Sequence, residues 1–149
     1  MSPGSLAPSL PRGTLRAMAD VVIEKVLMVD DEPHVRRVAE LSLARVGKWS
    51  VFLAASGAEA LAAAEREHPD LILLDVMMPG MDGPTTLSAL QAHAAVATIP
   101  VIFMTAKVQE REVERYLGLG AAGVISKPFD PMLLPAQIRR IIAGECRQA

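Results

Sequence analysis

The stretch EKVLMVDDEPHVRRVAELSLARVG, residues 24–47, decides the fold of this chain. It opens with the short apolar run KVLMV (25–29), which is typical of a strand buried on both faces of a parallel sheet. Pro33 then stands where proline is favoured, in the first turn of a helix, and Gly47 ends the helical pattern. We therefore predict a buried strand, an acidic turn and a helix in direct succession.

The predicted helix is amphipathic, because its apolar residues recur at helical spacing. We expect its buried stripe to comprise Val35, Val38, Leu41 and Val46, and its water-facing side to comprise Arg36, Arg37 and Glu40.

The same unit of strand and helix recurs along the rest of the chain. Apolar runs predict further strands at 50–55, 71–74, 100–105 and 123–126, and helical spacing predicts helices at 56–67, 84–93, 108–117 and 130–143. Parallel strands need helical crossovers, so five strands that alternate with five helices predict a doubly wound α/β domain. We expect a five-stranded parallel sheet of (βα)5 type, with helices on both faces.

The domain is expected to span residues 24–143, between two tails. Residues 1–20 are rich in Pro, Gly and Ser without periodicity, and we predict a disordered N-terminal tail there. Residues 144–149 form the expected C-terminal tail, with Cys146 as a free thiol in a frayed segment. A chain with a single cysteine cannot form an internal disulfide.

The composition is that of one ordinary globular domain. The 149 residues are 51% apolar, 21% charged and only 3% aromatic, with a formal net charge of −2. This argues against direct nucleic-acid binding, which calls for a basic surface or aromatic stacking platforms. No apolar run approaches the ~18–20 residues of a membrane span, and the N-terminus lacks the apolar core of a signal peptide. We expect no membrane insertion and a cytoplasmic location.

Reactive or charged residues stand at the ends of four of the five predicted strands. Asp30 and Asp31 follow the first strand, Asp75 the third, Thr105 ends the fourth and Lys127 follows the fifth. Ligands of such sheets bind beyond the carboxyl ends of the strands, so these residues are expected to meet. Three carboxylates with a lysine and a hydroxyl suit Mg²⁺ and a phosphate group, and aspartate is a known phosphoryl acceptor. The pattern indicates metal-assisted phosphoryl transfer onto a carboxylate.

Each of these residues also has a plainer interpretation. An aspartate after a strand is commonly a helix cap, and a lone threonine or lysine commonly has a structural or solvated role. Asp82 is expected to be no more than a turn residue or cap. The functional interpretation rests on the joint pattern, since the plainer one would have to hold independently at every strand end.

Four motifs resemble the receiver domains of two-component response regulators. They are VLMVDDEP (26–33), DLILLDVMMPGMDG (70–83), VIFMTAK (101–107) and GAAGVISKPF (120–129), in the family's order and at its spacing. The resemblance implies the flavodoxin-like strand order 2-1-3-4-5, for which a receiver of this family is a standard example.

The resemblance also implies a role for each site residue. Asp75 would be the phosphoacceptor, and Mg²⁺ would be bound by Asp31, by Asp75, by the backbone carbonyl of Met77 and, through water or as an outer ligand, by Asp30. Lys127, Thr105 and the amide of Ala106 would contact the phosphoryl group, with Thr105 moving toward it on activation. The Lys127–Pro128 peptide bond would be cis.

One position departs from the family's pattern. Members commonly carry Tyr or Phe three residues before the Lys of the Lys-Pro pair, and this chain has Val124. Valine has no ring to swing inward, so we expect signalling through the loop after Thr105 and the 108–117 helix. Met77 and Lys107 flank the site, and an apolar Met77 predicts no fast built-in hydrolysis of the phosphoryl group.

The expected function is that of a stand-alone receiver. A histidine kinase or a phosphotransfer protein would donate the phosphoryl group, and the domain would catalyse only its own phosphorylation and dephosphorylation. Since the chain ends soon after the last predicted helix, output is expected through contact with another protein. Two alternatives stay open: an aspartate-nucleophile phosphohydrolase, whose motif would instead be Asp-x-Asp after the first strand, and a degenerate receiver that only binds a partner.

Overall fold

A five-stranded parallel sheet forms the centre of the computed structural model, which describes residues 22–149. The predicted N-terminal tail, residues 1–20, lies outside the described residues. The sheet has the order β2-β1-β3-β4-β5, as predicted, and β2 and β5 are its two edge strands. The strands are β1 (Lys25–Val29), β2 (Ser50–Ala54), β3 (Leu71–Asp75), β4 (Val101–Thr105) and β5 (Gly123–Ser126).

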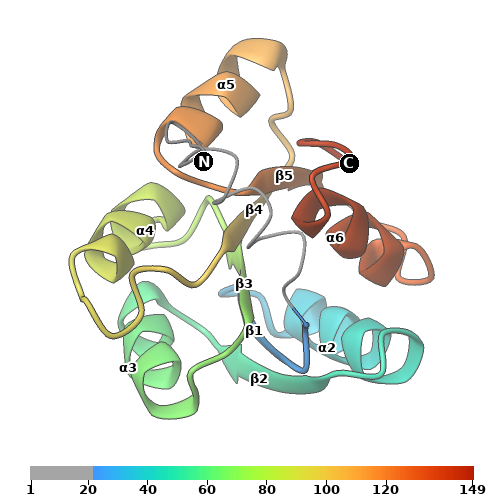
Figure 1. Cartoon of the computed structure of the whole chain (residues 1–149), viewed down its shortest axis with the longest axis horizontal. Helices are drawn as coiled ribbons and strands as arrows, with labels where there is room; N and C mark the ends of the chain where they lie inside the picture. The colour runs from blue at the N-terminus through green and yellow to red at the C-terminus, as the bar shows by residue number, and fades with distance from the viewer. Residues whose placement is uncertain (1–21) are drawn as a thin grey trace, which may run out of the picture.

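Helices cover both faces of this sheet (Figure 1). One face is covered by α2 and α6, and the other by α3, α4 and α5 (Figure 1). The helices are α2 (Pro33–Leu41), which continues into a π-helical turn η2 (Ser42–Val46), α3 (Gly57–Glu67), α4 (Gly83–Gln91), α5 (Glu110–Gly118) and α6 (Leu134–Ile142). No helix within residues 22–149 has the length and apolarity needed to cross a membrane.

Apart from the edge strand β2, the strands are buried on both faces, so their side chains build two separate cores. In β1, Leu27 and Val29 join the core under α3, α4 and α5, whereas Val26 and Met28 join the core under α2 and α6. The alternation has the period of two that strand geometry imposes. It explains why the strand segments are continuously apolar rather than alternating.

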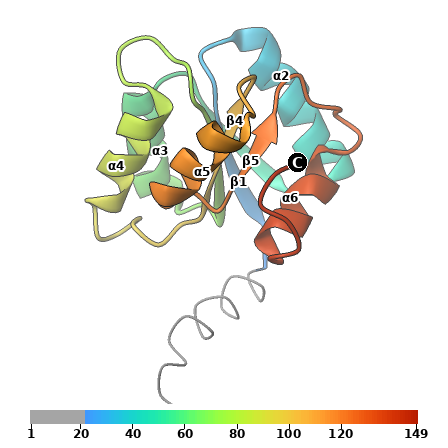
Figure 2. The ribbon, with the colours of Figure 1, turned by 90° about the horizontal axis from the view of Figure 1, so that it is seen from above.

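The strand register brings the carboxyl ends of the central strands to one edge. Val29 pairs with Leu74, Asp75 with Met104 and Thr105 with Ser126. Residues just beyond β1, β3, β4 and β5 therefore lie close together. In Figure 2 the loops at this edge occupy the upper side of the domain, opposite the end at which the described chain begins.

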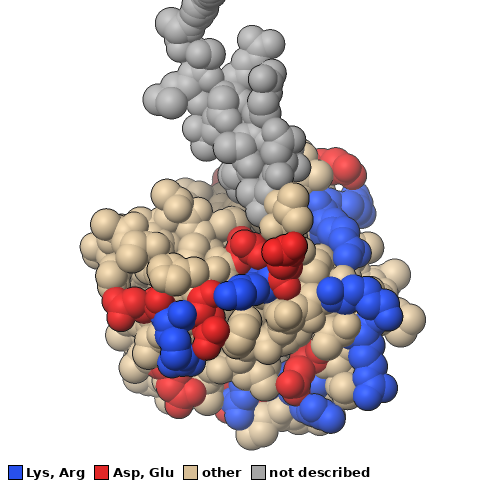
Figure 3. Space-filling model, turned by 60° about the horizontal axis from the view of Figure 1, so that its bottom comes forward, with Lys and Arg blue, Asp and Glu red and all other residues tan. Residues whose placement is uncertain are grey.

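At the opposite end of the sheet, where the strands begin, Asp70 joins β1 to β3. Its carboxylate accepts hydrogen bonds from the backbone amides of Glu24 and Lys25 at 2.8 and 2.9 Å, and Lys25 Nζ donates to the carbonyl of Glu67 at 3.0 Å. Figure 3 shows acidic and basic side chains next to one another close to where the grey residues begin. These contacts fix the start of β1 beside the start of β3.

The prediction that Val46 is buried was wrong, because the first helix does not stay α-helical to its end. In η2 the amide of Gly47 donates to the carbonyl of Ser42, five residues back. A π turn takes more residues per turn than an α turn and shifts the helical phase. Ser42 and Leu43 are therefore buried, and Val46 is 36% exposed.

The C-terminal residues also differ from the prediction. Residues 130–133 form a turn, so α6 begins at Leu134 rather than at 130. After α6 the chain turns at Gly144, whose φ is +80°, and residues 147–149 run parallel to β5. Cys146 is half-buried against the core under α2 and α6. The expectation of a frayed tail around this thiol was wrong.

Candidate functional site

Three carboxylates meet at the carboxyl edge of the sheet. Asp30 and Asp31 follow β1 and Asp75 ends β3, and one oxygen of each lies within 4.8 Å of the others. Asp30 is 0% exposed and Asp75 is 4% exposed. Buried acids so close to one another disfavour full ionisation unless a cation joins them. The donor set, carboxylate oxygen only, fits a hard divalent cation such as Mg²⁺.

Asp30 is fixed by its own turn and by the helix that follows. Its Oδ1 accepts a hydrogen bond from the amide of Glu32 at 2.9 Å, and its backbone carbonyl accepts one from Arg36 Nη1 at 2.6 Å. The sequence interpretation placed Arg36 in water, and this was wrong, because the side chain is half-buried and returns to the turn. Its role was missed since helical spacing alone puts Arg36 outside the apolar stripe.

Lys127 connects two of the carboxylates. Its Nζ donates to Asp30 Oδ2 at 2.9 Å and to Asp75 Oδ1 at 3.2 Å. The Lys127–Pro128 peptide bond is cis, as predicted. One cation thus lies between the two buried acids, and the third acid, Asp31, lies at the more exposed side of the cluster.

The pocket changes the acid–base properties of its groups. Burial, together with the negative charge of Asp30, raises the pKa of Asp75 to about 6, although Lys127 acts in the opposite direction. Burial by itself lowers the pKa of Lys127, but its hydrogen bonds and charge attraction to Asp30 and Asp75 outweigh this and raise the pKa. Lys127 therefore stays protonated and charged. Ionisation of the Asp75 carboxyl group in this pocket costs more free energy than it would in water.

Thr105 completes the edge from β4. It is 2% exposed, and its Oγ1 accepts a hydrogen bond from the amide of Lys107 at 3.0 Å. A cavity of about 320 Å³ opens in front of these groups; it is lined by Asp31, Glu32, Asp75, Met77, Thr105, Ala106 and Lys127. The structure therefore brings together the predicted site residues, and their chemical roles stay predictions.

The start of α4 packs directly against the backbone of Asp75. The amide of Gly83 donates to the carbonyl of Val76, and a Cβ on Gly83 would lie 2.6 Å from the carbonyl oxygen of Asp75. Glycine is therefore required by this close approach. Asp82 caps α4 by accepting a hydrogen bond from the amide of Thr85 at 2.9 Å, so its predicted role as a cap is confirmed.

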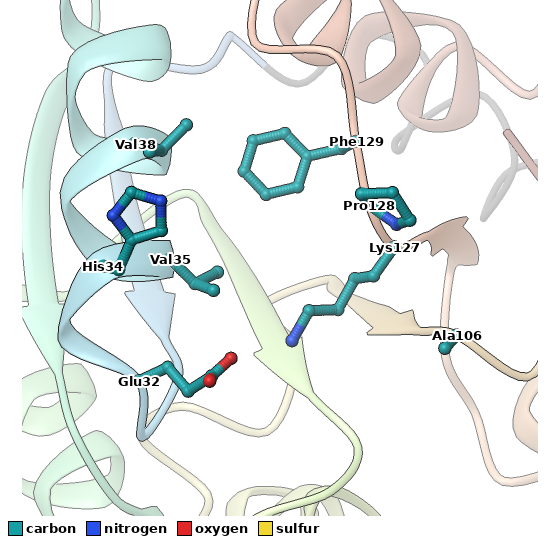
Figure 4. A pocket seen from close by; sticks show the side chains of 8 residues that line it. All are labelled: Glu32, His34, Val35, Val38, Ala106, Lys127, Pro128 and Phe129. Atoms are coloured by element: carbon teal, nitrogen blue, oxygen red, sulfur yellow. The ribbon is translucent and has the colours of Figure 1, made fainter.

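A second cavity, of about 450 Å³, adjoins the acidic pocket (Figure 4). It lies between α2, which contributes His34, Val35 and Val38, and the segment after β5, whose Phe129 points across it toward the helix (Figure 4). Lys127 extends from that same segment toward the end of β3 (Figure 4). The site therefore has an apolar side, which the polar residues at the strand ends did not reveal.

Val124 lies in β5, at the position where the receiver domains that the sequence resembles commonly carry Tyr or Phe. It is 0% exposed and packs in the core under α3, α4 and α5. Its backbone amide donates to Arg147, and its carbonyl accepts from Ala149. Residues 147–149 therefore pair with the backbone of Val124 on the side of β5 that faces away from β4.

The fold and the site define a doubly wound α/β domain with an acidic, lysine-bridged pocket at the carboxyl edge of its sheet. The family model of the response regulator receiver domain matches residues 26–139. The chain belongs to this family.

Relatives and solved structures agree with this assignment. The chain is 41% identical over 119 residues to the probable transcriptional regulator ycf27 of Porphyridium aerugineum, covering 80% of this chain and 48% of that protein. It is 38% identical over 119 residues to the alkaline phosphatase synthesis transcriptional regulatory protein PhoP of Bacillus subtilis, covering 80% and 48%. The structure of the chemotaxis protein CheY4 of Vibrio cholerae matches with a TM-score of 0.74 at 32% identity, covering 80% of this chain and 99% of that chain. This chain spans about half the length of the curated relatives it matches.

Proposed function

We propose that Asp75 accepts a phosphoryl group in a Mg²⁺-dependent reaction and that this modification switches a protein-interaction surface. The contact of Lys127 Nζ with both buried carboxylates, Asp30 and Asp75, carries the proposal. An ammonium group held beside a carboxylate is suited to receive the oxygens of a phosphoryl group in front of that carboxylate. The donor would be a histidine kinase or a phosphotransfer protein, in keeping with membership of the receiver family.

The metal would be held by the acidic cluster. Asp31 and Asp75 would bind Mg²⁺ directly and Asp30 through water or as an outer ligand, and the backbone carbonyl of Met77, a residue that lines the same cavity, would complete the protein ligands. Bound Mg²⁺ supplies neutralisation of the negative charge on the phosphoryl oxygens and the acceptor carboxylate.

The chain's own residues supply positioning. A carboxylate oxygen of Asp75 forms the bond to phosphorus while the bond from phosphorus to the donor's imidazole nitrogen breaks, and the electron pair leaves with the donor. Lys127 would follow the phosphoryl oxygens from its present contact with Asp75, and the Thr105 hydroxyl and the Ala106 amide would donate to them. The product is an acyl phosphate that adds about −2 charge at one point of the edge.

We propose that the domain turns over no separate substrate. Met77 is 66% exposed and lines the pocket, and its thioether offers no group that orients an attacking water. The acyl phosphate is therefore expected to persist long enough for a partner to bind. A cytoplasmic location stays part of the proposal, and the single unpaired thiol, Cys146, is compatible with a reducing compartment.

The test compares the wild-type chain with Asp75→Asn in the presence of acetyl phosphate, with and without Mg²⁺, by intact mass. Asp82→Asn is the matched control, because it removes a carboxylate seven positions away on an exposed cap where asparagine caps equally well. We expect labelling of wild type and of Asp82→Asn only with Mg²⁺, and none of Asp75→Asn.

Equal labelling of Asp75→Asn would show that the acceptor lies elsewhere. No labelling of any variant would favour a domain that only binds partners. Sustained phosphate release from an aryl phosphomonoester, lost in Asp75→Asn, would instead favour a phosphohydrolase.

A further inference from the structure

Residues 147–149 act as a short sixth strand on the free edge of β5. Gln148 forms a parallel bridge with Val124. The amide of Val124 donates to the carbonyl of Arg147, the amide of Ala149 donates to the carbonyl of Val124, and the amide of Ser126 donates to the carbonyl of Ala149, each at 2.9 Å. The α6 helix therefore serves as a crossover between β5 and this strand, and Figure 1 shows the end of the chain beside β5.

Residues 147–149 are connected to two segments that flank the proposed phosphorylation site, the one before Lys127 and the one after Thr105. Ser126 directly precedes Lys127, whose own amide donates to the carbonyl of Thr105 at 2.9 Å. On the other side, Gln148 Nε2 donates to the carbonyl of Val108 at 3.4 Å, in the loop after Thr105. Residues 147–149 thus contact the strand that carries the lysine and the loop that follows the threonine.

The loop after Thr105 has open space beside it. It is held at its start by the bond from the Lys107 amide to Thr105 Oγ1, at 3.0 Å. A cavity of about 460 Å³, lined by Ala106, Lys107, Val108, Gln109 and Glu112, lies along the loop. If a phosphoryl group draws Thr105 Oγ1 into the acidic pocket, the hydrogen bond to the Lys107 amide is lost, and the loop is released to shift along this cavity.

The attachment itself is weak enough to respond. It consists of three backbone hydrogen bonds, the long bond from Gln148 and the packing of the half-buried Ala149 against the core under α2 and α6, while Arg147 and Gln148 are exposed. A net backbone hydrogen bond contributes only about 1 kcal/mol. Segments with few buried contacts open locally far below the free energy of global unfolding.

We propose that phosphorylation of Asp75 detaches residues 147–149 from β5, and that this detachment serves as the readout in place of the aromatic residue replaced by Val124. The inference rests on the proposed function, since it needs a phosphoryl group on Asp75. Detachment leaves the amide and carbonyl of Val124 and the amide of Ser126 unpaired on an open strand edge. Such an edge takes an extended segment of a partner protein by strand addition.

The test measures hydrogen exchange of individual amides in the full chain, with and without Mg²⁺ and beryllofluoride, which mimics the phosphoryl group. We expect exchange at Val124, Ser126 and Ala149 to rise on the order of tenfold, as for a weakly held segment that opens locally. Amides of β1, in the interior of the sheet, are the internal reference and should not accelerate.

Two variants make the result specific. Asp75→Asn should show no response to beryllofluoride. Gln148→Ala cuts the link to the loop but leaves the backbone pairing, so exchange at Ala149 should already be faster without the mimic and should respond less to it. By reciprocity of linkage, Gln148→Ala should also be phosphorylated by acetyl phosphate at least as readily as wild type.

The two proposals fail in different ways. If acetyl phosphate labels Asp75 but the three amides exchange at unchanged or slower rates with beryllofluoride, this inference is overturned and the proposed function stands. If Asp75 is not labelled at all, the proposed function fails, and the inference fails with it.

Discussion

Asp75 and Asp82 lie seven positions apart, at the two ends of one loop. The fold raises the pKa of the first carboxyl group and lowers the pKa of the second. Asp75 is buried beside Asp30, and its pKa is raised to about 6, mainly by burial. Asp82 is exposed at the start of α4, and the hydrogen bonds from Thr85 lower the pKa of its carboxyl group. The difference teaches that an acid at a helix start stabilises the fold, whereas an acid at the strand end is retained at a cost to stability.

The largest expected effect is on phosphorylation and comes from removing Lys127, which contacts Asp75 but not Asp82. In Lys127→Met, the ammonium is lost from Asp30 and Asp75, and we expect the rate of labelling by acetyl phosphate to fall on the order of 100-fold, as when one charge-stabilising donor is removed. Lys25→Met, at the opposite edge of the sheet, is the control and should label normally. Normal labelling of Lys127→Met would show that the contact of Lys127 with Asp75 does not support phosphoryl transfer.

Of the two glycines near Asp82, Gly83 at the start of α4 should be sensitive to substitution, and Gly80 in the preceding loop should be tolerant. Gly83→Ala places a Cβ 2.6 Å from the carbonyl oxygen of Asp75 and 2.8 Å from Val76 Cα, so we expect a loss of about 3 kcal/mol in the free energy of unfolding. Gly80→Ala meets no atom within 4 Å and suffers only from its φ of +74°, which costs about 1 kcal/mol. Denaturant titration of both variants tests this, and equal losses would contradict it.

The cost of the buried acid should be visible as a pH dependence of stability in the Mg²⁺-free chain. The folded-state pKa of Asp75, about 6, lies above its ordinary value of 3.8, so the folded chain holds this proton to higher pH than the unfolded chain. The contribution of Asp75 to stability is therefore greatest below pH ~4, falls as pH rises between about 4 and 6, and stays low above that.

Asp75→Asn should remove the decrease in stability between pH 4 and pH 6 that comes from ionisation of Asp75. At pH 7, without Mg²⁺, we expect this variant to be more stable than wild type by about 2 kcal/mol, somewhat less than the full value of a shift of this size. Denaturant titration at pH 4 and pH 7, in the presence of a chelator, measures both effects. A variant no more stable than wild type at pH 7 would show that Lys127 fully compensates the buried charge.

The smallest effect is expected at the exposed acid. Asp82→Ala removes the N-cap of α4 and should lower the free energy of unfolding by about 1 kcal/mol, whereas Asp82→Asn should cost a few tenths at most. The same titration measures both. A gain in stability from Asp82→Ala would mean that both acids are costly, and the contrast with Asp75 would disappear.

Features set by local pattern were predictable from the sequence. The apolar runs located the strands, Pro33 and Ser56 marked helix starts, and Asp30, Asp75 and Thr105 were placed at one edge because parallel strands share a direction. The family resemblance supplied the strand order. What these predictions have in common is that each depends on neighbours in the chain or on the topology as a whole.

The features that escaped prediction depend on contacts that pattern does not encode. The π turn at Ser42–Val46 shifts the helical phase and exposes Val46, although the apolar spacing continues through it. Arg36 returns to the carbonyl of Asp30 from a position that looks solvent-facing. Residues 147–149 carry no strand pattern, and their pairing follows from the turn at Gly144 and the free edge of β5.

The pairing of residues 147–149 with β5 also bears on self-assembly. In the part of the chain that the structure describes, residues 22–149, β2 ends the sheet on one side and has no strand paired to its outer edge, while on the other side residues 147–149 cover the outer edge of β5. Residues 147–149 are the outermost segment on that side, and they present a shorter edge than the four residues of β5. Very short edge strands discourage edge-to-edge pairing between molecules. Three residues of added strand thus lower the tendency of the β5 side to pair with a second copy of the chain.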